Sequence, residues 1–405
     1  MKIKDIKTFV VGNKSIHRGG PYWVFVKVTT DCGTVGYGEV YGVAFHPKAL
    51  VAMIDDMFDR HFAGADPFKI ERHFRHVYSA GFSQRPDPTV MGIFSGIEMA
   101  LWDIIGKALD KPVYELLGGK VHERLRSYTY LNAPADAASN KKVYDDPDAA
   151  AERALEYIAQ GFTALKFDPA RPYTAFDPRQ LSMETLDFAD RYTARVREAV
   201  GTSCDILIGT HGEMSPSGAL RLARRLEAHD PLWFEEPTPP DNIAGMARVA
   251  AGTRIPVATG ERLTTKYEFA DLLRQDAASI LQMNLGRVGG ILEAKKIASM
   301  GEAFHAQIAP HLFCGPVVGA ANIQVSACSP NFLIMEGIEQ WGGFHAEILT
   351  TPIRWEDGYI IPPTAPGLGV ELNEAVAEAN PYTGERLQLR MGDEPACAIL
   401  AETTP

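Results

Sequence analysis

The chain has 405 residues, of which 46% are hydrophobic and 22% are charged, and its formal net charge is −11. This length exceeds what one small core needs and predicts about two domains. The negative charge argues against nucleic acid as a partner, because phosphate binding needs a basic face. No apolar run approaches the roughly 20 residues of a membrane helix, so no membrane partner is expected either.

The N-terminal sequence MKIKDIKTFVVGNK has no long apolar stretch before a small-residue cleavage site. It therefore predicts a strand rather than a signal peptide, and a cytoplasmic protein. The five cysteines are scattered, and no two of them share a CxxC spacing: Cys32, Cys204, Cys314, Cys328 and Cys397. We expect buried free thiols instead of a disulfide framework or a thiolate zinc site.

The first stretch of the chain is predicted to mix strands and helices. Trp23–Thr30 (WVFVKVTT) alternates and is rich in β-formers, and the following DCGTVGYGE predicts a turn and a second strand. Pro88–Gly119 is predicted to be helical, because Ile97, Leu101 and Ile104 form one apolar stripe.

From about Ser127 the pattern changes to short apolar runs of β type, each followed by a helical stretch. Asp146-Pro147 and Ser215-Pro216 are helix starts, each with a capping residue and a proline at the first helical position. The eight runs are SYTYLN (Ser127–Asn132), ALKFD (Ala164–Asp168), DILIGT (Asp205–Thr210), LWFEEP (Leu232–Pro237), IPVATGE (Ile255–Glu261), SILQMN (Ser279–Asn284), AQIAPH (Ala306–His311) and FLIMEG (Phe332–Gly337).

Continuous apolar strands that alternate with helices indicate a parallel sheet that is buried on both faces. Eight of them in about 210 residues favour a closed α/β barrel of the TIM type. An open doubly wound sheet is the alternative, but it usually brings a glycine-rich phosphate loop. Nothing of the form GxGxxG follows the first run.

Polar side chains stand at the C-terminal ends of these runs, where such a barrel builds its active site. A single carboxylate there is more often a helix cap or a surface partner than a ligand. Several carboxylates at one mouth are different, because buried like charges raise one another's pKa unless a cation neutralises them. Oxygen ligands favour Mg2+, with Mn2+ as the alternative. The residues are Lys166, Asp168, Glu235, Glu236, Glu261, His311 and Glu336.

Five further motifs occur in the chain: SGIEMALWDIIGKALDKPVYELLGG (Ser95–Gly119), WFEEP (Trp233–Pro237), VATGE (Val257–Glu261), GRVGG (Gly286–Gly290) and PGLGVE (Pro366–Glu371). With these motifs, in this order and spacing, the sequence resembles the enolase superfamily nearly from end to end. Within that superfamily it resembles the mandelate racemase/muconate lactonizing enzyme-like proteins, and is nearest to the galactonate- and mannonate-type sugar-acid dehydratases.

The resemblance implies a (β/α)7β barrel with an α+β capping domain. Residues 1–123 would form the N-terminal part of the cap and residues 124–358 the barrel, and the tail at 359–405 would pack on the cap. It also implies removal of the proton α to a carboxylate, with Mg2+ stabilising the enediolate that results.

By position, Glu235 and Glu261 match two of the three metal ligands of that family. The third ligand, an aspartate on the third strand, is replaced here by Gly209. We expect Asp168 to swing into the space left by Gly209 and to supply the missing oxygen.

The second strand also departs from the family. Lys166 matches the first lysine of its KxK motif, but the second lysine is replaced by Asp168. His211 and Glu213 are the alternatives to Asp168 as the third metal ligand. Lys166 is expected either to act as the base, with its pKa lowered beside Mg2+, or to stay charged and bind the substrate carboxylate.

Three further positions carry expected roles at the acid-base site. His311 matches a seventh-strand histidine that is a base in many members, and Glu336 matches an acid that hydrogen-bonds the substrate carboxylate. His211 matches a histidine that protonates the departing hydroxyl in galactonate-type dehydratases. The aspartate that pairs with the seventh-strand histidine is replaced by Asn284, so we expect His311 to be a poorer base, and rather a neutral hydrogen-bond donor or a weak acid-base group.

Two loops occupy places where family members carry specificity loops. Arg18, in the segment His17–Tyr22, and Arg85, in the segment Gly81–Pro88, are expected to bind a distal group of the substrate. As solvated loop arginines they would need no such role.

The sequence therefore predicts a Mg2+-dependent dehydratase of carbohydrate catabolism that converts a small-molecule sugar acid to a 2-keto-3-deoxy acid. Epimerisation, racemisation or cycloisomerisation through the same enediolate is the first alternative. A Schiff-base aldolase that uses Lys166 and a non-catalytic sugar-acid binder are the others. A homo-oligomer, either dimer or octamer, is expected.

Overall fold

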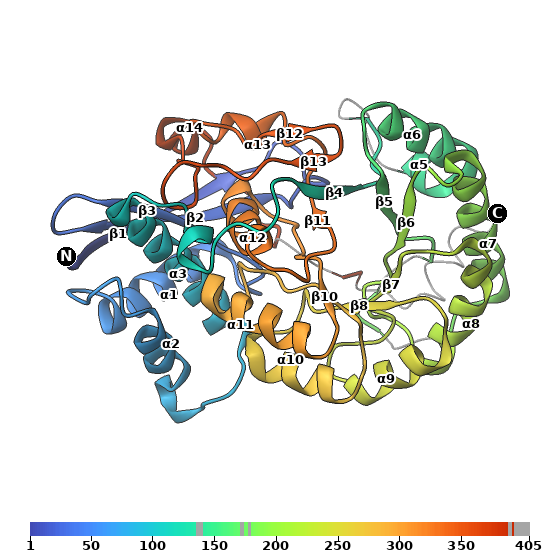
Figure 1. The fold of residues 1–405 in the computed structure, drawn as a ribbon, viewed down its shortest axis with the longest axis horizontal. Coiled ribbons are helices and arrows are strands. Elements are labelled where there is room, and N and C mark those ends of the chain that lie inside the picture. The colour runs from blue at the N-terminus through green and yellow to red at the C-terminus, as the bar shows by residue number, and fades with distance from the viewer. Residues whose placement is uncertain (135–140, 171–173, 177–179, 388–390, 393–405) are drawn as a thin grey trace. The chain divides into compact units, whose positions relative to one another are not determined.

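The computed structural model describes residues 1–134, 141–170, 174–176, 180–387 and 391–392 (Figure 1). The chain folds into two compact units that are built from interleaved segments. The first unit is Met1–Arg126, Glu261–Ala270 and Gln282–Leu389, and the second unit is Ser127–Gly260, Asp271–Leu281 and Arg390–Pro405. The division into 1–123, 124–358 and 359–405 stays a prediction.

The first unit begins with an antiparallel sheet of three strands, β1 (Ile3–Gly12), β2 (Tyr22–Thr30) and β3 (Val35–Val40), in the order β1-β2-β3. All residues of β2 except Lys27 and Thr29 are buried. Burial on both faces of the strand explains its run of β-branched and aromatic residues. The predicted pair of strands is confirmed.

Helix α3 (Pro88–Leu109) packs along this sheet (Figure 1). It begins where the Asp87 side chain accepts hydrogen bonds from the amides of Thr89 and Val90. The sheet approaches the helix closely at Gly38, where a Cβ atom would collide with the backbone of α3. The helix has the length and hydropathy of a membrane span, but 83% of its most apolar window is buried inside the protein, as in a core helix.

The predicted helical stretch to Gly119 is interrupted. Asp110 adopts a left-handed conformation with φ of 53°, and Pro112 cannot donate to a continuing helix. Only a short helix, α4 (Val113–Leu116), follows.

The other elements of the first unit are α1 (Pro47–His61), α2 (Ile70–Tyr78), a 3-10 helix (Ala80–Phe82), the start of α10 (Thr265–Arg274), α11 (Gly290–Ala303), β10 (Gln307–Ile308), α12 (Pro316–Ala327), β11 (Met335–Glu336), α13 (Phe344–Glu347), β12 (Trp355–Glu356), β13 (Tyr359–Ile360) and α14 (Glu374–Ala379).

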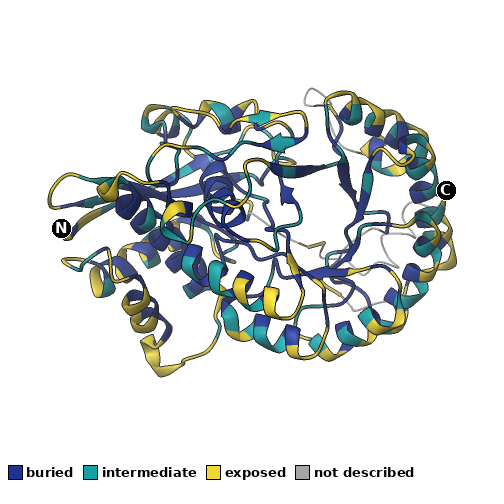
Figure 2. Cartoon of the chain, in the orientation of Figure 1, coloured by how far each residue is buried: buried dark blue, intermediate teal, exposed yellow. Residues whose placement is uncertain are grey.

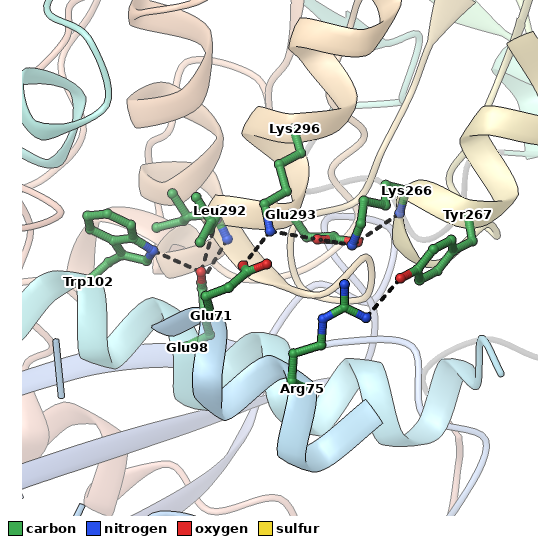
Figure 3. Close-up of polar contacts among 10 residues, drawn as sticks. Glu71, Arg75, Glu98, Trp102, Lys266, Tyr267, Leu292, Glu293 and Lys296 are labelled. Atoms are coloured by element: carbon green, nitrogen blue, oxygen red, sulfur yellow. Dashed lines mark hydrogen bonds and ion pairs between the residues drawn. The ribbon is translucent and has the colours of Figure 1, made fainter. Parts of the chain in front are cut away.

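A buried carboxylate of α3 fixes the start of α11 (Figure 3). Glu98 accepts hydrogen bonds from the amides of Ile291 (2.7 Å) and Leu292 (2.9 Å) and from the indole of Trp102 (2.8 Å). Burial raises the pKa of Glu98 to about 7. These bonds satisfy amides that have no partner within their own helix, so they hold the first turn of α11 in one place.

The second unit contains the parallel strands β5 (Ala164–Phe167), β6 (Asp205–Ile208), β7 (Trp233–Glu235), β8 (Val257–Thr259) and β9 (Ile280–Leu281), together with most of β4 (Leu125–Tyr130). They pair in chain order from β4 to β9. The helices are α5 (Lys141–Asp145), α6 (Pro147–Ala159), α7 (Met183–Val200), the 3-10 helix Glu227–His229 after α8 (Pro216–Leu226), and α9 (Ile243–Gly252).

Helices α6 to α9 lie outside strands β5 to β8, and the strands are buried (Figures 1 and 2). Asp146 and Ser215 cap α6 and α8 as predicted. Each of the eight predicted runs contains a strand. Among the cysteines, Cys204, Cys314 and Cys328 are buried free thiols, whereas Cys32 is free but exposed because it lies in the turn between β2 and β3. Cys397 lies outside the described residues.

Candidate active site

Strand β5 of the second unit presents Lys166 on the face opposite to Phe167. The ring of Phe167 lies 5.3 Å from that of Tyr192 on α7, so the alternation of a strand turns Lys166 away from the helix. Lys166 is fully buried, and its ammonium group forms an ion pair with the carboxylate of Glu235 at the end of β7. Its Nζ atom also lies 4.8 Å from the ring centre of Tyr130. The pair is thus a buried charge with a buried counter-charge.

Asp168 lies at the place where the family aspartate is missing. A Cβ atom built on Gly209 would collide with Oδ1 of Asp168, which means that this carboxylate fills the space beside β6. Its Oδ2 atom lies 3.2 Å from Nδ1 of His211, and the hydroxyl of Tyr130 donates to Oδ1 at 3.5 Å. The aspartate of β5 therefore stands where a side chain of β6 would otherwise stand.

Two residues that follow these strands have a left-handed backbone. His211 has φ of 51° and Glu236 has φ of 42°, and neither is a glycine. Such conformations cost of order 1–3 kcal/mol and persist where the surroundings enforce them, often at functional sites. Thr210 helps to enforce the backbone conformation at Glu236, because its hydroxyl lies 2.7 Å and 2.9 Å from the carbonyl oxygens of Glu235 and Glu236. The sequence offered no signal for Thr210.

In the first unit, His311 lies between an amide and two carboxylates. The side-chain amide of Asn284 donates to Nδ1 at 2.8 Å, since its Oδ1 already accepts from the amide of Gly286 at 2.8 Å. With Nδ1 as the acceptor, a neutral imidazole carries its proton on Nε2. Nε2 lies 3.3 Å from Glu261 and 4.0 Å from Glu336. His311 is thus arranged as a donor from Nε2.

Glu336, at the end of β11, is buried and accepts a hydrogen bond from the amide of Leu312 at 2.7 Å. The segment that follows His311 therefore holds one of its oxygens.

Two residues near His311 escaped the sequence analysis. Tyr41 places its ring 5.9 Å from the imidazole, and burial raises the pKa of Tyr41 well above its usual range, so the phenol stays neutral. The guanidinium of Arg287 lies 5.2 Å from the ring of Tyr41 and donates to the carbonyl of Glu261 at 3.1 Å. The motif GRVGG was recognisable in the sequence, but nothing there distinguished its arginine.

The two loop arginines differ in their surroundings. Arg18 donates to both oxygens of Glu339, from Nε at 2.9 Å and from Nη2 at 2.8 Å. Glu339 belongs to the loop after β11, so the ion pair joins this loop to the β1–β2 loop. Arg85 is exposed. Both residues stay predicted substrate contacts.

The oxygens of Asp168, Glu235 and Glu261 suit a hard divalent cation by their chemistry. Among the residues that the structure describes, no three His, Cys, Asp or Glu side chains are grouped as metal ligands. The reason is visible within each unit, since Asp168 faces His211, Glu235 faces Lys166 and Glu261 faces His311. Within the second unit, the room that Gly209 leaves is filled by an oxygen of Asp168, which suits the chemistry of a cation ligand.

Alternating parallel strands and helices with acids, a lysine and a histidine after the strands define an enzyme of the enolase type, and the comparison with known proteins agrees. Residues 149–376 match the family described as "Enolase C-terminal domain-like". Residues 10–118 match the "Mandelate racemase / muconate lactonizing enzyme, N-terminal domain". The chain belongs to the mandelate racemase/muconate lactonizing enzyme family of the enolase superfamily, whose members generally bind Mg2+. This confirms the predicted fold class, a TIM-type barrel with an α+β capping domain.

Individual relatives cover nearly the whole chain. D-galactonate dehydratase of Ralstonia nicotianae is 36% identical over 387 residues, which are 93% of each protein. D-gluconate dehydratase of Thermoproteus tenax is 32% identical over 98% of this chain and 77% of its own. The solved structure of a mandelate racemase/muconate lactonizing enzyme candidate from Labrenzia alexandrii DFL-11 is 60% identical, with a TM-score of 0.94, over 97% of this chain and all of the other.

Proposed function

We propose that this protein is a hydro-lyase that dehydrates a sugar acid to its 2-keto-3-deoxy acid. The observation that carries the proposal is the buried ion pair of Lys166 and Glu235 at the ends of β5 and β7. An amine and carboxylates after parallel strands are the groups that proton abstraction beside a carboxylate needs. The similarity to D-galactonate and D-gluconate dehydratases along the chain supports the reaction class.

The proposed reaction balances without a redox partner. The C2–H bond breaks and its proton passes to a base, while the electron pair forms a C2–C3 double bond. The C3–O bond breaks, and the hydroxide leaves as water with a proton from an acid. The resulting enol takes up a proton at C3 and loses the proton of its C2 hydroxyl, which gives the 2-keto-3-deoxy acid.

Lys166 is the proposed base. Its burial, its position on the side of β5 away from α7 and its contacts with Glu235 and Tyr130 hold the amine in one place. A positioned base contributes about 10²- to 10⁴-fold to a rate. A lysine that stays charged and only binds the substrate carboxylate would make a different contribution, which an arginine at this position could replace.

His211 is the proposed acid for the departing hydroxyl. The backbone of His211 is left-handed, and its Nδ1 atom lies 3.2 Å from Oδ2 of Asp168, which is close enough for an ion pair when the imidazole is protonated. Asp168 is proposed as the third metal ligand, with His211 and Glu213 as the alternatives.

His311 is proposed to act as a hydrogen-bond donor to the substrate rather than as the base. The support is the bond from Asn284 to Nδ1, which keeps the proton of the neutral ring on Nε2. Glu336 is proposed to contact the substrate carboxylate, and Arg18 and Arg85 to contact the distal end of the substrate.

Asp168, Glu235 and Glu261 are proposed to hold Mg2+, with Mn2+ as the alternative. When bound, the metal would stabilise the negative charge that develops on the substrate carboxylate. That all three carboxylates and His311 serve one substrate is supported by sequence order, since each stands at or just after the C-terminal end of its own strand or predicted run.

Proton NMR in D2O tests the proposal, with a panel of sugar acids that includes D-galactonate and D-gluconate, in Mg2+ and in EDTA. Formation of a 2-keto-3-deoxy acid in Mg2+ but not in EDTA is the expected result. Deuterium at C2 without loss of water would replace dehydration by epimerisation or another isomerisation. Turnover that is unaffected by EDTA, with a lysine adduct trapped by borohydride, would favour an aldolase. Tight binding without turnover or exchange would favour a non-catalytic binder.

The predicted partners are a small-molecule sugar acid and a second copy of the chain. The homo-oligomer, dimer or octamer, and the cytoplasmic location stay predictions. Size-exclusion chromatography with light scattering would establish the number of subunits.

A further inference from the structure

We propose that Arg287 is a positioning residue that holds Glu261 and the imidazole of His311 in the geometry that turnover requires. The inference rests on the proposed function, because it assigns roles to Glu261 and His311. Arg287 belongs to the first unit, as do all the residues that it is argued to act on.

The guanidinium of Arg287 bridges two segments that are far apart in the sequence. Nη1 donates to the carbonyl of Glu261 at 3.1 Å, and Nη2 donates to the carbonyl of Gly42 at 3.3 Å. Gly42 has φ of 71°, and a Cβ atom there would collide with the guanidinium. The shape of the chain after β3 is therefore complementary to this side chain.

The position is costly for a guanidinium. Arg287 is only 8% exposed, and no carboxylate within the described chain forms an ion pair with it. Its Nε atom is buried with no hydrogen-bond partner among the same residues. Burying a guanidinium without a carboxylate partner and leaving its Nε donor unsatisfied each cost free energy, against which stand two hydrogen bonds to carbonyls and the ring of Tyr41. The contacts that offset this cost are those to the backbone of Glu261 and to Tyr41, on which the proposed role depends.

Arg287 also constrains both sides of the imidazole. On one side its guanidinium lies 5.2 Å from the ring of Tyr41, which lies 5.9 Å from His311. On the other side its backbone amide donates to the carbonyl of Asn284 at 3.0 Å, and the amide of Asn284 donates to His311. A shift of Arg287 would thus move Tyr41 and Asn284, the two neighbours that determine the orientation of the His311 imidazole.

The segment that carries Arg287 is anchored at its far end. Ser95 on α3 accepts from the amide of Gly289 at 2.9 Å, and Glu98 holds the next amides at the start of α11 (Figure 3). Because α3 is a buried helix, this end cannot easily follow a displacement. The segment of Arg287 is therefore fixed relative to α3, and the hydrogen bond from the guanidinium fixes the backbone of Glu261 relative to that segment.

Hydrogen–deuterium exchange tests the contact itself. Arg287→Lys and Arg287→Gln are compared with Arg197→Gln, a matched control. Arg197 also donates only to backbone carbonyls, those of His229, Gly201, Cys204 and Asp230, and touches none of the candidate site residues. Exchange at residues 40–44 and 259–263 is expected to rise at least about tenfold in both Arg287 variants and to stay unchanged in the control. Unchanged exchange there in folded Arg287 variants would overturn the proposal, whatever the protein catalyses.

Kinetics and metal binding test the consequence. With the sugar acid that the wild-type protein turns over, kcat of Arg287→Lys is expected to fall by about 10- to 100-fold with KM within about threefold, because a displacement of about 1 Å costs this much. The affinity for Mn2+, measured by calorimetry, should fall as well, and millimolar guanidinium should restore part of kcat in Arg287→Ala. A loss that merely follows the melting temperature, as in Arg197→Gln, would reduce Arg287 to a structural residue. If the wild type shows neither turnover nor Mn2+ binding, the proposed function fails, and the exchange data still decide the contact.

Discussion

The strand ends of the second unit and those of the first unit carry similar residue types but are organised differently. In the second unit, a buried lysine pairs with Glu235, and the carboxylate of Asp168 lies in the space beside Gly209. In the first unit, the side-chain amide of Asn284 contacts Nδ1 of His311, at a position where the resemblance to the family implies an aspartate.

The difference shows how a lost charge can be tolerated. A glycine leaves empty space, and a side chain from the adjacent strand β5 is long enough to fill it. An asparagine leaves no space, since it has almost the shape of an aspartate, so its effect is electronic. It donates where the acid would accept, and this changes which nitrogen of His311 carries the proton.

The largest expected effect comes from Glu235→Gln. If Glu235 is a metal ligand as proposed, its loss should lower kcat/KM at least about 10³-fold, since metal stabilisation of developing charge amounts to several kcal/mol. Lys166 would keep its charge in a buried place without a counter-charge, which costs about 3 kcal/mol of stability. Turnover, Mn2+ calorimetry and urea unfolding measure the three quantities. Wild-type kinetics in this variant would remove Glu235 from the site.

Lys166→Arg separates the two roles of the lysine. Arginine keeps a positive charge but does not give up its proton. If Lys166 is the base, exchange of the C2 proton in D2O should fall by about 10²- to 10⁴-fold while substrate affinity changes little. Retention of most of the exchange would make the residue a carboxylate binder.

Gly209→Asp tests whether the carboxylate of Asp168 takes the place of one on β6. Alone, the new side chain should collide with Asp168 and reduce metal affinity and turnover by about 10- to 100-fold. The double variant Gly209→Asp/Asp168→Ala should recover at least about tenfold, since it returns the acid to β6. Thermal melting of both proteins controls for misfolding. Equal losses in the single and double variants would exclude Asp168 as a stand-in.

Asn284→Asp tests the first unit in the same way. The new carboxylate should accept a hydrogen bond from Nδ1–H, which leaves the lone pair of a neutral ring on Nε2, so that His311 becomes a base. We expect about a tenfold rise in C2 exchange without water loss, relative to dehydration, in the NMR assay. An unchanged ratio would mean that Asn284 does not control the imidazole.

His345 offers the smallest effect on activity and a contrast with His311 in the same unit. It is buried beside the rings of Trp23 and Trp341, and burial lowers its pKa to about 4 from the usual 6.5. The unfolded chain then binds a proton more readily than the folded one, so stability is lost as the pH falls from 6.5 toward 4. The difference corresponds to about 3 kcal/mol.

Urea unfolding between pH 4 and 7 measures this effect. His345→Gln should show a shallower loss of stability at acid pH than the wild type. Glu39 and Glu98, whose pKa values burial raises to about 7, act in the opposite direction, but they do so in both proteins and cancel in the comparison. Equal slopes would place the acid sensitivity elsewhere.

Much of the fold could be predicted because its signals are local. The apolar runs, the capping residues Asp146 and Ser215 and the alternation of β2 all depend on near neighbours in the chain. The break at Asp110 was missed, since the apolar stripe continues up to it and only the left-handed turn before Pro112 ends the helix.

The sequence by itself determined which chemical groups follow which strand, because the βα period places each strand end at a predictable point. It also determined the departures at Gly209, Asp168 and Asn284. Only the tertiary structure decided that Asp168 fills the space at Gly209 and that the proton of a neutral His311 lies on Nε2. It also decided that Arg18 pairs with Glu339 and that Arg287 donates to the backbone carbonyl of Glu261. These outcomes depend on which atoms of distant residues meet and on which of them donates, and no local pattern in the chain encodes that.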